Sequence, residues 1–184
     1  MAVAASEPRI LLDDAAIGRA VDGLAAAIRA RHPEGRFYFV GIESRGVFLA
    51  RRLAGILAED FGERPLGTLD ISLYRDDLDG LKSVPQLRGS HIPFDMDGAT
   101  VILCDDVLYT GRTIRAALEE MMDFGRPARV ELCVLLDRGR RELPIQADYV
   151  AARHETAANE YIRVRLREQD DRDAVVLGQK EVSQ

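Results

Sequence analysis

The chain of 184 residues contains few residues that form disulfides or metal sites, with two cysteines and three histidines. Cys104 and Cys133 stand inside apolar, strand-like segments, so we expect buried thiols rather than a disulfide or a metal site. The three histidines are far apart and lack metal-ligand spacing, which favours surface positions. No apolar run approaches the roughly 20 residues that a membrane span needs. The N-terminal segment also lacks the basic and apolar regions of a secretory signal, so we expect a cytoplasmic protein with no membrane segment.

Positive charge is also scarce, because 25 Lys and Arg face 31 Asp and Glu and the net charge is −6. This balance disfavours a broad nucleic-acid-binding surface. It leaves open a local basic patch, for which Arg138, Arg140 and Arg141 stand out. The content of 47% hydrophobic and 30% charged residues is ordinary for a globular protein, so we expect residues 1–184 to form a single domain.

Apolar runs and helical periodicities alternate along the chain. Strands are predicted at residues 37–42, 69–74, 101–104, 130–136, 147–151, 161–166 and 174–177. Helices are predicted to start at Asp13 or Asp14, at Val47 and near Ile114, and to end before Pro33, near Gly62 and before Gly125. The apolar inner stripe of the third helix runs from Ile114 to Met122. Strands that alternate with helices imply an α/β fold, with a mainly parallel twisted sheet flanked by helices. Ligands in such folds bind at the carboxyl ends of the strands.

The segment VILCDDVLYTGRT, residues 101–113, is the most informative part of the chain. A covered strand runs into Asp105 and Asp106, and a glycine-bearing loop then leads into a helix. Backbone N–H groups at such a helix start, with the helix dipole, suit a phosphate group. The two carboxylates suit sugar hydroxyls or a hydrated Mg²⁺. A ligand that needs all of these is a phosphorylated sugar carrying a metal-bound pyrophosphate.

Two other loops follow predicted strands and are expected to lie at the same edge of the sheet. In the turn GIESRG, Gly41 and Gly46 allow backbone to approach a ligand, and Ser44 and Arg45 supply hydrogen bonds and positive charge. The loop DRGRRELP spans residues 137–144. Three loops that converge at strand ends favour a ligand site there.

Residues 101–113 closely resemble the phosphoribosyl-pyrophosphate (PRPP) signature of type I phosphoribosyltransferases. The LYTGRT portion is similar to one branch, the pyrimidine-operon regulators that are also uracil phosphoribosyltransferases, and the resemblance extends from the first helix to about Tyr149. It implies Asp105, Asp106 and Arg45 as catalytic residues, with Mg²⁺ held by the two aspartates directly or through water. It implies a set of residues that bind PRPP phosphates: Ser44, Arg45, Gly46, Tyr109, Thr110, Gly111, Arg112 and Thr113.

The resemblance also implies a flexible flap over residues 75–98, in which Arg75 and Lys82 reach phosphate oxygens on closure. The flap is rich in charge, Gly and Pro, and a β-hairpin with HIPF as one arm is compatible with its sequence. For the base, the resemblance implies a pocket near Val107, Arg138 and Gly139, whose backbone groups hydrogen-bond uracil.

One position separates this chain from the 6-oxopurine phosphoribosyltransferases, which carry an Asp immediately before the Thr-Gly pair. Here the residue is Tyr109, and a phenol with a pKa near 10 is a poor general base at neutral pH. The substitution favours a pyrimidine over hypoxanthine or guanine as the acceptor base.

The expected reaction is transfer of a phosphoribosyl group from PRPP to uracil, which gives uridine monophosphate and pyrophosphate. The same protein is expected to sense uridine nucleotides and regulate pyrimidine genes. The alternative is mainly an RNA-binding transcription attenuation regulator with weak or no catalysis, and salvage of another base also remains open. Pyrimidine-operon messenger RNA is then a partner, for which Arg140 and Arg141 are weak candidate contacts. The resemblance implies a homo-oligomer, a dimer or higher.

Overall fold

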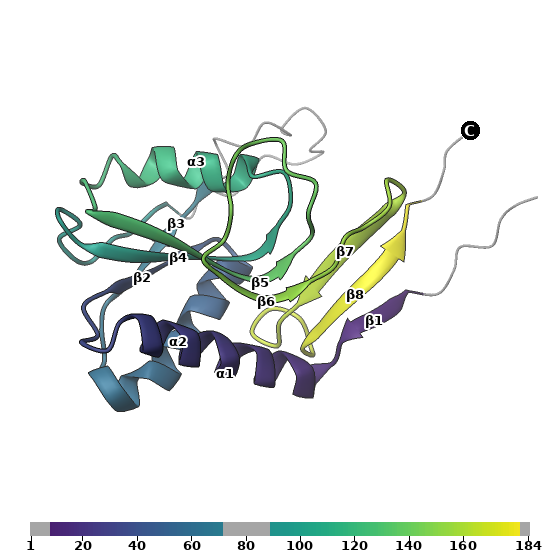
Figure 1. Ribbon diagram of the computed structural model, residues 1–184, viewed down its shortest axis with the longest axis horizontal. Helices are drawn as coiled ribbons and strands as arrows, with labels where there is room; N and C mark the ends of the chain where they lie inside the picture. Colours follow the sequence, from purple (N-terminus) through teal and green to yellow (C-terminus); the bar gives the residue numbers. More distant parts are fainter. Residues whose placement is uncertain (1–7, 72–88, 181–184) are drawn as a thin grey trace, which may run out of the picture.

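The computed structural model describes residues 8–71 and 89–180, and its centre is a five-stranded parallel sheet in the order β3-β2-β4-β5-β6. The strands are β2 (Tyr38–Ile42), β3 (Leu66–Leu69), β4 (Thr100–Leu108), β5 (Arg129–Asp137) and β6 (Tyr149–Arg153). One face is covered by α3 (Arg112–Met121), and the other by α1 (Asp14–Arg31) and α2 (Arg45–Phe61) (Figure 1). The predicted α/β fold is confirmed.

A second, antiparallel sheet of three strands has the order β1-β8-β7 and stands beside the larger sheet (Figure 1). Its strands are β1 (Arg9–Leu12), β7 (Glu160–Arg165) and β8 (Ala174–Gln179). The sequence indicated two of them and missed β1, because four residues are too few to show a periodicity. Val164 and Val175 from this sheet pack with Ile17 of α1, so the small sheet shares the main core.

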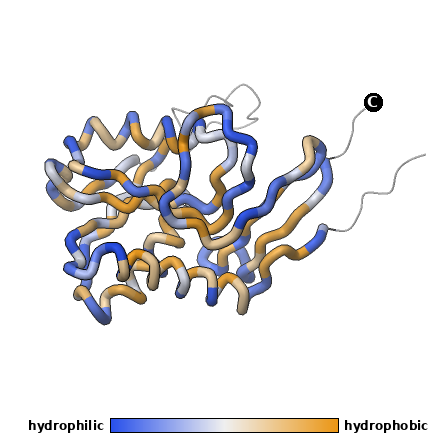
Figure 2. The backbone as a smooth tube through the Cα atoms, in the orientation of Figure 1, coloured by the Kyte–Doolittle hydropathy of each residue, from blue (hydrophilic) through white to orange (hydrophobic). Residues whose placement is uncertain are grey.

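Helix α1 begins where the sequence placed its cap. The Asp13 carboxylate accepts a hydrogen bond of 2.8 Å from the Ala16 N–H, which satisfies a backbone donor that the first helical turn leaves unpaired. Apolar side chains at helical spacing, among them Val21, Leu24 and Ile28, are buried against the sheet. Figure 2 shows hydrophobic residues concentrated along the strands of the sheets, with hydrophobic and hydrophilic residues interleaved along the helices.

Two apolar cores lie on opposite faces of the large sheet, one beneath α1 and α2 and one beneath α3. Cys104 and Cys133 are buried free thiols in the first core, as predicted. In the second core Met121 is fully buried, whereas Met122 is 44% exposed. The buried stripe of α3 therefore ends one residue earlier than its sequence pattern predicted. None of the helices that the structure describes is long and apolar enough to cross a membrane.

The strand predicted at residues 69–74 is wrong in position, because β3 covers Leu66–Leu69. Pairing with β2 sets this position: Phe39 is in register with Leu66 and Ile42 with Leu69, and β2 ends at Ile42. Asp70 and Ile71 follow the strand and are buried. The misleading pattern is the alternation of the apolar residues Leu69 and Ile71 with the polar Asp70, although all three residues are buried.

Residues 72–88, including Arg75 and Lys82, lie outside the described residues, so most of the predicted flap does too. Residues 89–98 of that range belong to the folded body. The Phe94 ring stacks on Tyr38 with 4.2 Å between ring centroids, and Met96 is 1% exposed. In the described residues, the HIPF segment forms one isolated antiparallel bridge, between His91 and Thr68. It does not form a hairpin arm there. The described part of the predicted flap, residues 89–98, is therefore packed on the sheet.

One histidine departs from the expected surface position. The His32 side chain, at the C-terminal end of α1, is 15% exposed, and its Nε2 atom lies 2.7 Å from a carboxylate oxygen of Glu131. Glu131 lies on β5, and its side chain is 1% exposed. A buried acid that points towards the helix explains the position of His32, and a single sequence gives no sign of this partner.

Candidate active site

The segment of β4 that holds Asp105 and Asp106 and the turn after β2 lie side by side, because the two strands are parallel neighbours with Gly41 opposite Cys104. The strand predicted to end at Cys104 continues through both aspartates to Leu108. The chain leaves β2 at Ile42 and enters α2 at Arg45. It leaves the apolar part of β4 at Asp105 and Asp106. The structure thus brings together two of the three loops that the sequence analysis predicted to converge.

Gly46 sets how closely these two segments approach. A Cβ atom built on Gly46 would lie 2.3 Å from the Cys104 carbonyl oxygen and 3.1 Å from the Asp105 Cα atom. At Gly41 a Cβ atom would lie 2.4 Å from the Val47 Cα atom. The sequence predicted that these glycines admit a ligand, but the structure shows that they admit the protein's own backbone.

The two adjacent carboxylates differ in their surroundings. Asp105 is 6% exposed and accepts a 3.0 Å hydrogen bond from the Asp106 N–H, while Asp106 accepts a 2.9 Å bond from the Val107 N–H. Burial raises the pKa of Asp106, and the nearby positive charge of Arg45 opposes that rise. A further cation beside Asp106 would stabilise its charged form, and a metal-bearing ligand provides one.

The donor set suits a magnesium ion that arrives with a substrate. In residues 8–71 and 89–180 no group of three or more His, Cys, Asp or Glu side chains is placed to hold a metal ion. Mg²⁺ is commonly held by one or two carboxylates together with substrate phosphates and water, rather than by a cage made only of protein. The pair Asp105 and Asp106 fits this arrangement.

The predicted phosphate loop forms the start of α3. Gly111 is the N-cap residue with φ of 95°, in the left-handed region that favours glycine, and it makes no side-chain cap bond. The first N–H groups of a helix have no partner within the helix, so they are suited to an anion. The Thr110 hydroxyl accepts from the Arg112 N–H at 3.3 Å, and Thr113 lies half-buried in the first turn. The Arg112 guanidinium bonds Glu142 at 2.8 Å, so its side chain faces the neighbouring loop.

The loop after β5 holds the phosphate loop in place. The Thr110 carbonyl accepts hydrogen bonds from the N–H groups of Glu142 and Leu143, at 2.9 and 3.1 Å. A Cβ atom on Gly111 would lie 3.3 Å from the Leu143 Cβ atom. The third of the converging loops therefore packs directly on the phosphate loop, as the sequence predicted.

Arg138 is committed to contacts within the protein. Its guanidinium lies 4.0 Å from the centroid of the Tyr109 ring and donates to the Thr156 hydroxyl at 2.6 Å and to the Glu160 carbonyl at 2.7 Å. Its N–H donates to the Leu108 carbonyl at 2.8 Å. These contacts hold the Tyr109 ring at the start of the loop that follows β4.

Of the other residues in this loop, Gly139 and Arg141 form hydrogen bonds within the protein, and Arg140 is exposed. The Gly139 N–H donates to Asp137 at 2.9 Å. The Arg141 guanidinium donates to Asp137 and to the carbonyls of Tyr109, Gly139 and Ile145, at 2.6 to 3.1 Å. Arg140 is exposed, with φ of 54°. The predicted RNA pair thus contains one arginine that fastens its own loop and one that faces solvent.

A segment that the sequence analysis did not single out contacts the turn after β2. The Ser44 hydroxyl donates to Gln169 at 2.8 Å, and Nη2 of Arg45 donates to both carboxylate oxygens of Asp170, at 3.0 and 3.2 Å. Both partners come from the connection between β7 and β8. They are 125 residues away in sequence, and no pattern in a single sequence links them.

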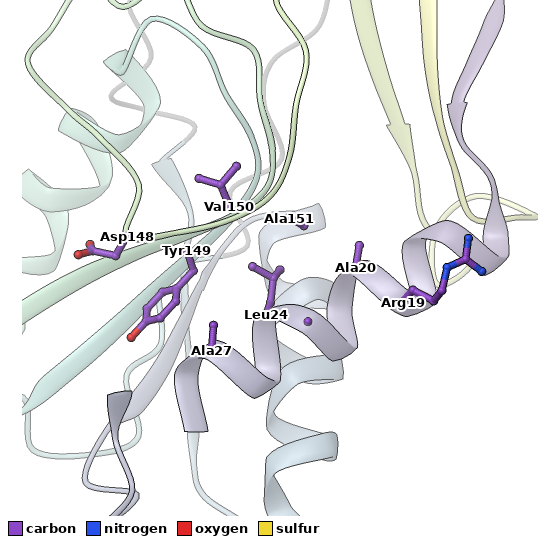
Figure 3. Close-up of a pocket in the computed structure, with 9 residues that line it drawn as sticks. Arg19, Ala20, Leu24, Ala27, Asp148, Tyr149, Val150 and Ala151 are labelled. Atoms are coloured by element: carbon purple, nitrogen blue, oxygen red, sulfur yellow. The ribbon is translucent and has the colours of Figure 1, made fainter. Parts of the chain in front are cut away.

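A cavity of about 420 Å³ lies elsewhere, between α1 and the start of β6 (Figure 3). Small or apolar residues make up much of its lining, including Ala20, Leu24 and Ala27, and Asp148 and Tyr149 stand at one end. It includes none of the residues predicted to bind PRPP or a base. The predicted ligand site is instead the edge where β2, β4 and β5 end.

Comparison with known proteins gives a match over nearly all of this fold. A family model described as the phosphoribosyl transferase domain matches residues 9–170. Bifunctional protein PyrR of Listeria monocytogenes serotype 4b is 47% identical over 178 residues, which covers 94% of this chain and 97% of that protein. Bifunctional protein PyrR of Thermus aquaticus is 53% identical over 143 residues, which covers 77% of this chain and 79% of that protein.

Solved structures of purine phosphoribosyltransferases share the fold at low identity. A hypoxanthine-guanine phosphoribosyltransferase from Bacillus anthracis superposes with a TM-score of 0.67 and 18% identity, covering 95% of this chain and 99% of that one. The hypoxanthine phosphoribosyltransferase of Trypanosoma cruzi gives a TM-score of 0.67 and 19% identity, covering 94% and 97%. These likenesses support the fold, whereas the choice of base depends on the site.

Proposed function

Because the chain belongs to the phosphoribosyltransferase family, in its PyrR branch, we propose that it transfers a phosphoribosyl group from PRPP to uracil. The products are uridine monophosphate and pyrophosphate. One observation carries the proposal: the pair Asp105 and Asp106 lies in the last four residues of β4, beside Arg45 and in the segment that leads to the Gly111-capped start of α3. This arrangement provides places for a sugar, a pyrophosphate and a phosphate in one site.

The proposed roles follow from where charge develops. Breaking the anomeric C–O bond leaves positive charge on the ribose ring and negative charge on the departing pyrophosphate. Asp105 and Asp106 accept hydrogen bonds from the ribose hydroxyls and place negative charge near the ring. N–H groups at the start of α3 hold the 5′-phosphate, and Arg45 stabilises the pyrophosphate. Fixed groups of this kind accelerate the reaction by positioning and electrostatics, without a covalent nucleophile.

The pair Asp105 and Asp106 would also hold Mg²⁺, directly or through water. When bound, Mg²⁺ neutralises part of the charge on the pyrophosphate leaving group. The pKa of Asp106, raised by burial, supports this role, because a cation at the site favours the carboxylate form. Arg75 and Lys82, which lie outside the described residues, remain proposed phosphate contacts from the flap.

The proposed acceptor is a pyrimidine because Tyr109 replaces the carboxylate that a 6-oxopurine enzyme uses. Arg138 holds the Tyr109 ring in place, and the N–H groups of Arg138 and Gly139 are already bonded to Leu108 and Asp137. We therefore expect this loop to offer uracil its carbonyl oxygens, which accept from the N3–H. An unpaired polar group in this pocket would cost about 1–3 kcal/mol, so a base with a different donor pattern binds more weakly.

A regulatory role is the second part of the proposal, since the relatives are named bifunctional. We infer that uridine nucleotides bind in the same pocket and control binding to pyrimidine-operon messenger RNA. Exposed Arg140 is the favoured RNA contact, because Arg141 is engaged within its own loop. A cytoplasmic homo-oligomer, a dimer or higher, remains our expectation for the working form.

The test is an assay of the purified protein with PRPP, Mg²⁺ and a panel of free bases. Uracil should give the highest kcat/KM, product formation should require Mg²⁺, and hypoxanthine and guanine should be poor acceptors. Efficient use of either purine above uracil would overturn the proposed base. If no base gave product while the protein still bound uridine monophosphate and RNA, only the regulatory part of the proposal would stand.

A further inference from the structure

We propose that Asp170 is a positioning residue, which holds the Arg45 guanidinium where pyrophosphate binds. The segment Leu166–Asp173, here called the 166–173 loop, then acts as a rigid support for the turn after β2. This inference rests on the proposed function in one respect, the contact between Arg45 and pyrophosphate. It adds a residue from the connection between β7 and β8 to a site otherwise built from the ends of β2, β4 and β5.

The contact between Arg45 and Asp170 uses only part of the guanidinium. Nη2 of Arg45 donates to both carboxylate oxygens of Asp170, at 3.0 and 3.2 Å, and the two side chains are 26% and 24% exposed. Nε of Arg45 is buried and has no hydrogen-bond partner within the described part of the chain. Because a guanidinium carries five N–H donors, engagement of Nη2 leaves donors for a phosphate oxygen.

Asp170 is itself fixed by its own loop. Its Oδ2 atom accepts a 3.0 Å hydrogen bond from the Leu166 N–H, and its N–H donates to the Leu166 carbonyl at 2.7 Å. The carboxylate therefore keeps one position whether or not Arg45 is bound. A group held in this way fixes a long, flexible side chain better than a mobile surface acid does.

The 166–173 loop is fastened to α2 at several points. Arg52 donates to Glu168 at 2.6 and 2.7 Å and to Asp173 at 2.6 and 2.8 Å. The Asp173 side chain is 3% exposed, so this pair is shielded from solvent on one side. With the 2.8 Å bond from Ser44 to Gln169, these contacts join the loop to the first turns of α2 and to the residue before it.

The structure favours support over competition between Asp170 and pyrophosphate. Arg45 keeps this contact with Asp170 while its neighbour Gly46 packs against β4, where a Cβ atom on Gly46 would lie 3.1 Å from the Asp105 Cα atom. Arg45 is therefore already at the reacting edge of the sheet when it is bound to Asp170. Without Asp170, the same side chain would have to be ordered by the substrate alone, at a cost in conformational entropy.

The test compares Asp170→Asn and Asp170→Ala with Asp171→Ala, a matched control that removes an exposed acid from the same loop. Asp170→Asn keeps an oxygen for the Leu166 N–H, so it should preserve the loop. Both Asp170 variants should lose on the order of 10- to 100-fold in kcat/KM for PRPP, with KM for uracil nearly unchanged. Calorimetry with inorganic pyrophosphate and Mg²⁺ should show weaker binding, and Asp171→Ala should match the wild type.

A double-mutant cycle separates an action through Arg45 from a general weakening of the fold. If Asp170 acts by positioning Arg45, the combination Arg45→Ala with Asp170→Ala should be no worse than Arg45→Ala alone. Fully additive losses, pyrophosphate binding equal to that of Asp171→Ala, or tighter pyrophosphate binding would each overturn the proposal. A wild type inactive with every base would refute the proposed reaction, whereas the calorimetric comparison would still decide the role of Asp170.

Discussion

The Tyr149 hydroxyl donates a 2.6 Å hydrogen bond to Oε2 of Glu131, a carboxylate that is 1% exposed on the neighbouring strand. Glu131 also contacts His32 at 2.7 Å and Arg31 at 3.0 Å. Burial alone would raise the pKa of Glu131, but the hydrogen bonds from Tyr149 and His32 and the charge of Arg31 outweigh it, so the pKa is lowered. These contacts join the end of α1 to β5 and β6, away from the proposed site.

Replacing Tyr149 by Phe should destabilise the protein by about 1–3 kcal/mol, because a buried carboxylate then lacks one of its donors. The measurement is urea unfolding at neutral pH. Tyr38→Phe is the matched control, since it removes the same hydroxyl from a half-buried ring on β2 and should change stability little. Equal stability of the two variants would mean that the hydrogen bond from Tyr149 contributes nothing net.

The lowered pKa of Glu131 also determines how the stability of the protein should depend on pH. Since folding lowers the pKa of Glu131, its contribution is fully present above the ordinary glutamate pKa, about 4.3, and is lost as the pH falls through the lower value of the folded state. Glu131→Gln should therefore flatten that part of the stability profile. Thermal unfolding measured between about pH 3 and 6 tests this, and identical profiles would contradict it.

The double substitution Asp105→Asn with Asp106→Asn should abolish turnover and leave the fold intact. Activity should be lost because the ribose hydroxyls and Mg²⁺ lose their charged ligands. The fold should survive because burial raises the pKa of Asp106, which means that its charge is not favoured by the folded state. An activity assay measures the loss of turnover, and thermal unfolding of the same samples measures whether the fold is intact. Undiminished activity would refute the proposed mechanism.

Gly46→Ala should destabilise the protein and weaken PRPP binding, because the new Cβ would lie 2.3 Å from the Cys104 carbonyl oxygen and α2 would have to move. Gly55→Ala is the control in the same helix. Nothing lies within 4 Å of a Cβ atom at Gly55, so this change should stabilise the helix by about 0.5–1 kcal/mol. Opposite shifts in unfolding temperature are expected, and parallel shifts would contradict the close approach.

Charge reversal at the exposed Arg140 should weaken binding to pyrimidine-operon leader RNA and make it less sensitive to salt, by about 0.7 to 0.9 in the log–log slope if one phosphate contact is lost. Titrations at several salt concentrations, with uridine monophosphate and with a scrambled RNA as control, test this. Thr156→Val is a useful comparison, because it removes an acceptor of Arg138 without changing charge. An unchanged slope for the Arg140 variant would exclude this residue as an RNA contact.

The local parts of the proposed site could be predicted from the sequence because they are contiguous. In residues 101–113 the strand with its two acids, the loop and the helix start follow one another, so adjacency in sequence is adjacency in space. The α/β order followed similarly from alternating periodicities. The position of β3 could not be predicted, because pairing with β2 sets it. The apolar residues Leu69 and Ile71 on either side of Asp70 imitate a strand pattern beyond the strand end.

Other features depend on partners that one sequence does not reveal. The charge of Arg141 suggested contact with RNA, yet its guanidinium bonds three carbonyls and Asp137 inside its own loop. The role of Gly46 depends on the Cys104 carbonyl of another strand. In each case the residue type indicated which interactions the residue can make, and the tertiary contact determined which interaction it makes.

The link between Arg45 and Asp170 has a consequence for synthesis on the ribosome, where a chain folds from its N-terminal end. All five strands of the parallel sheet, β2 to β6, precede Asp170, so this sheet can assemble before that residue emerges. During this interval Arg45 lacks its acceptor, and the pyrophosphate end of the site is unfinished. An incomplete chain of this kind would have the phosphate loop but an unsupported Arg45, so full activity would appear only once the 166–173 loop had been translated.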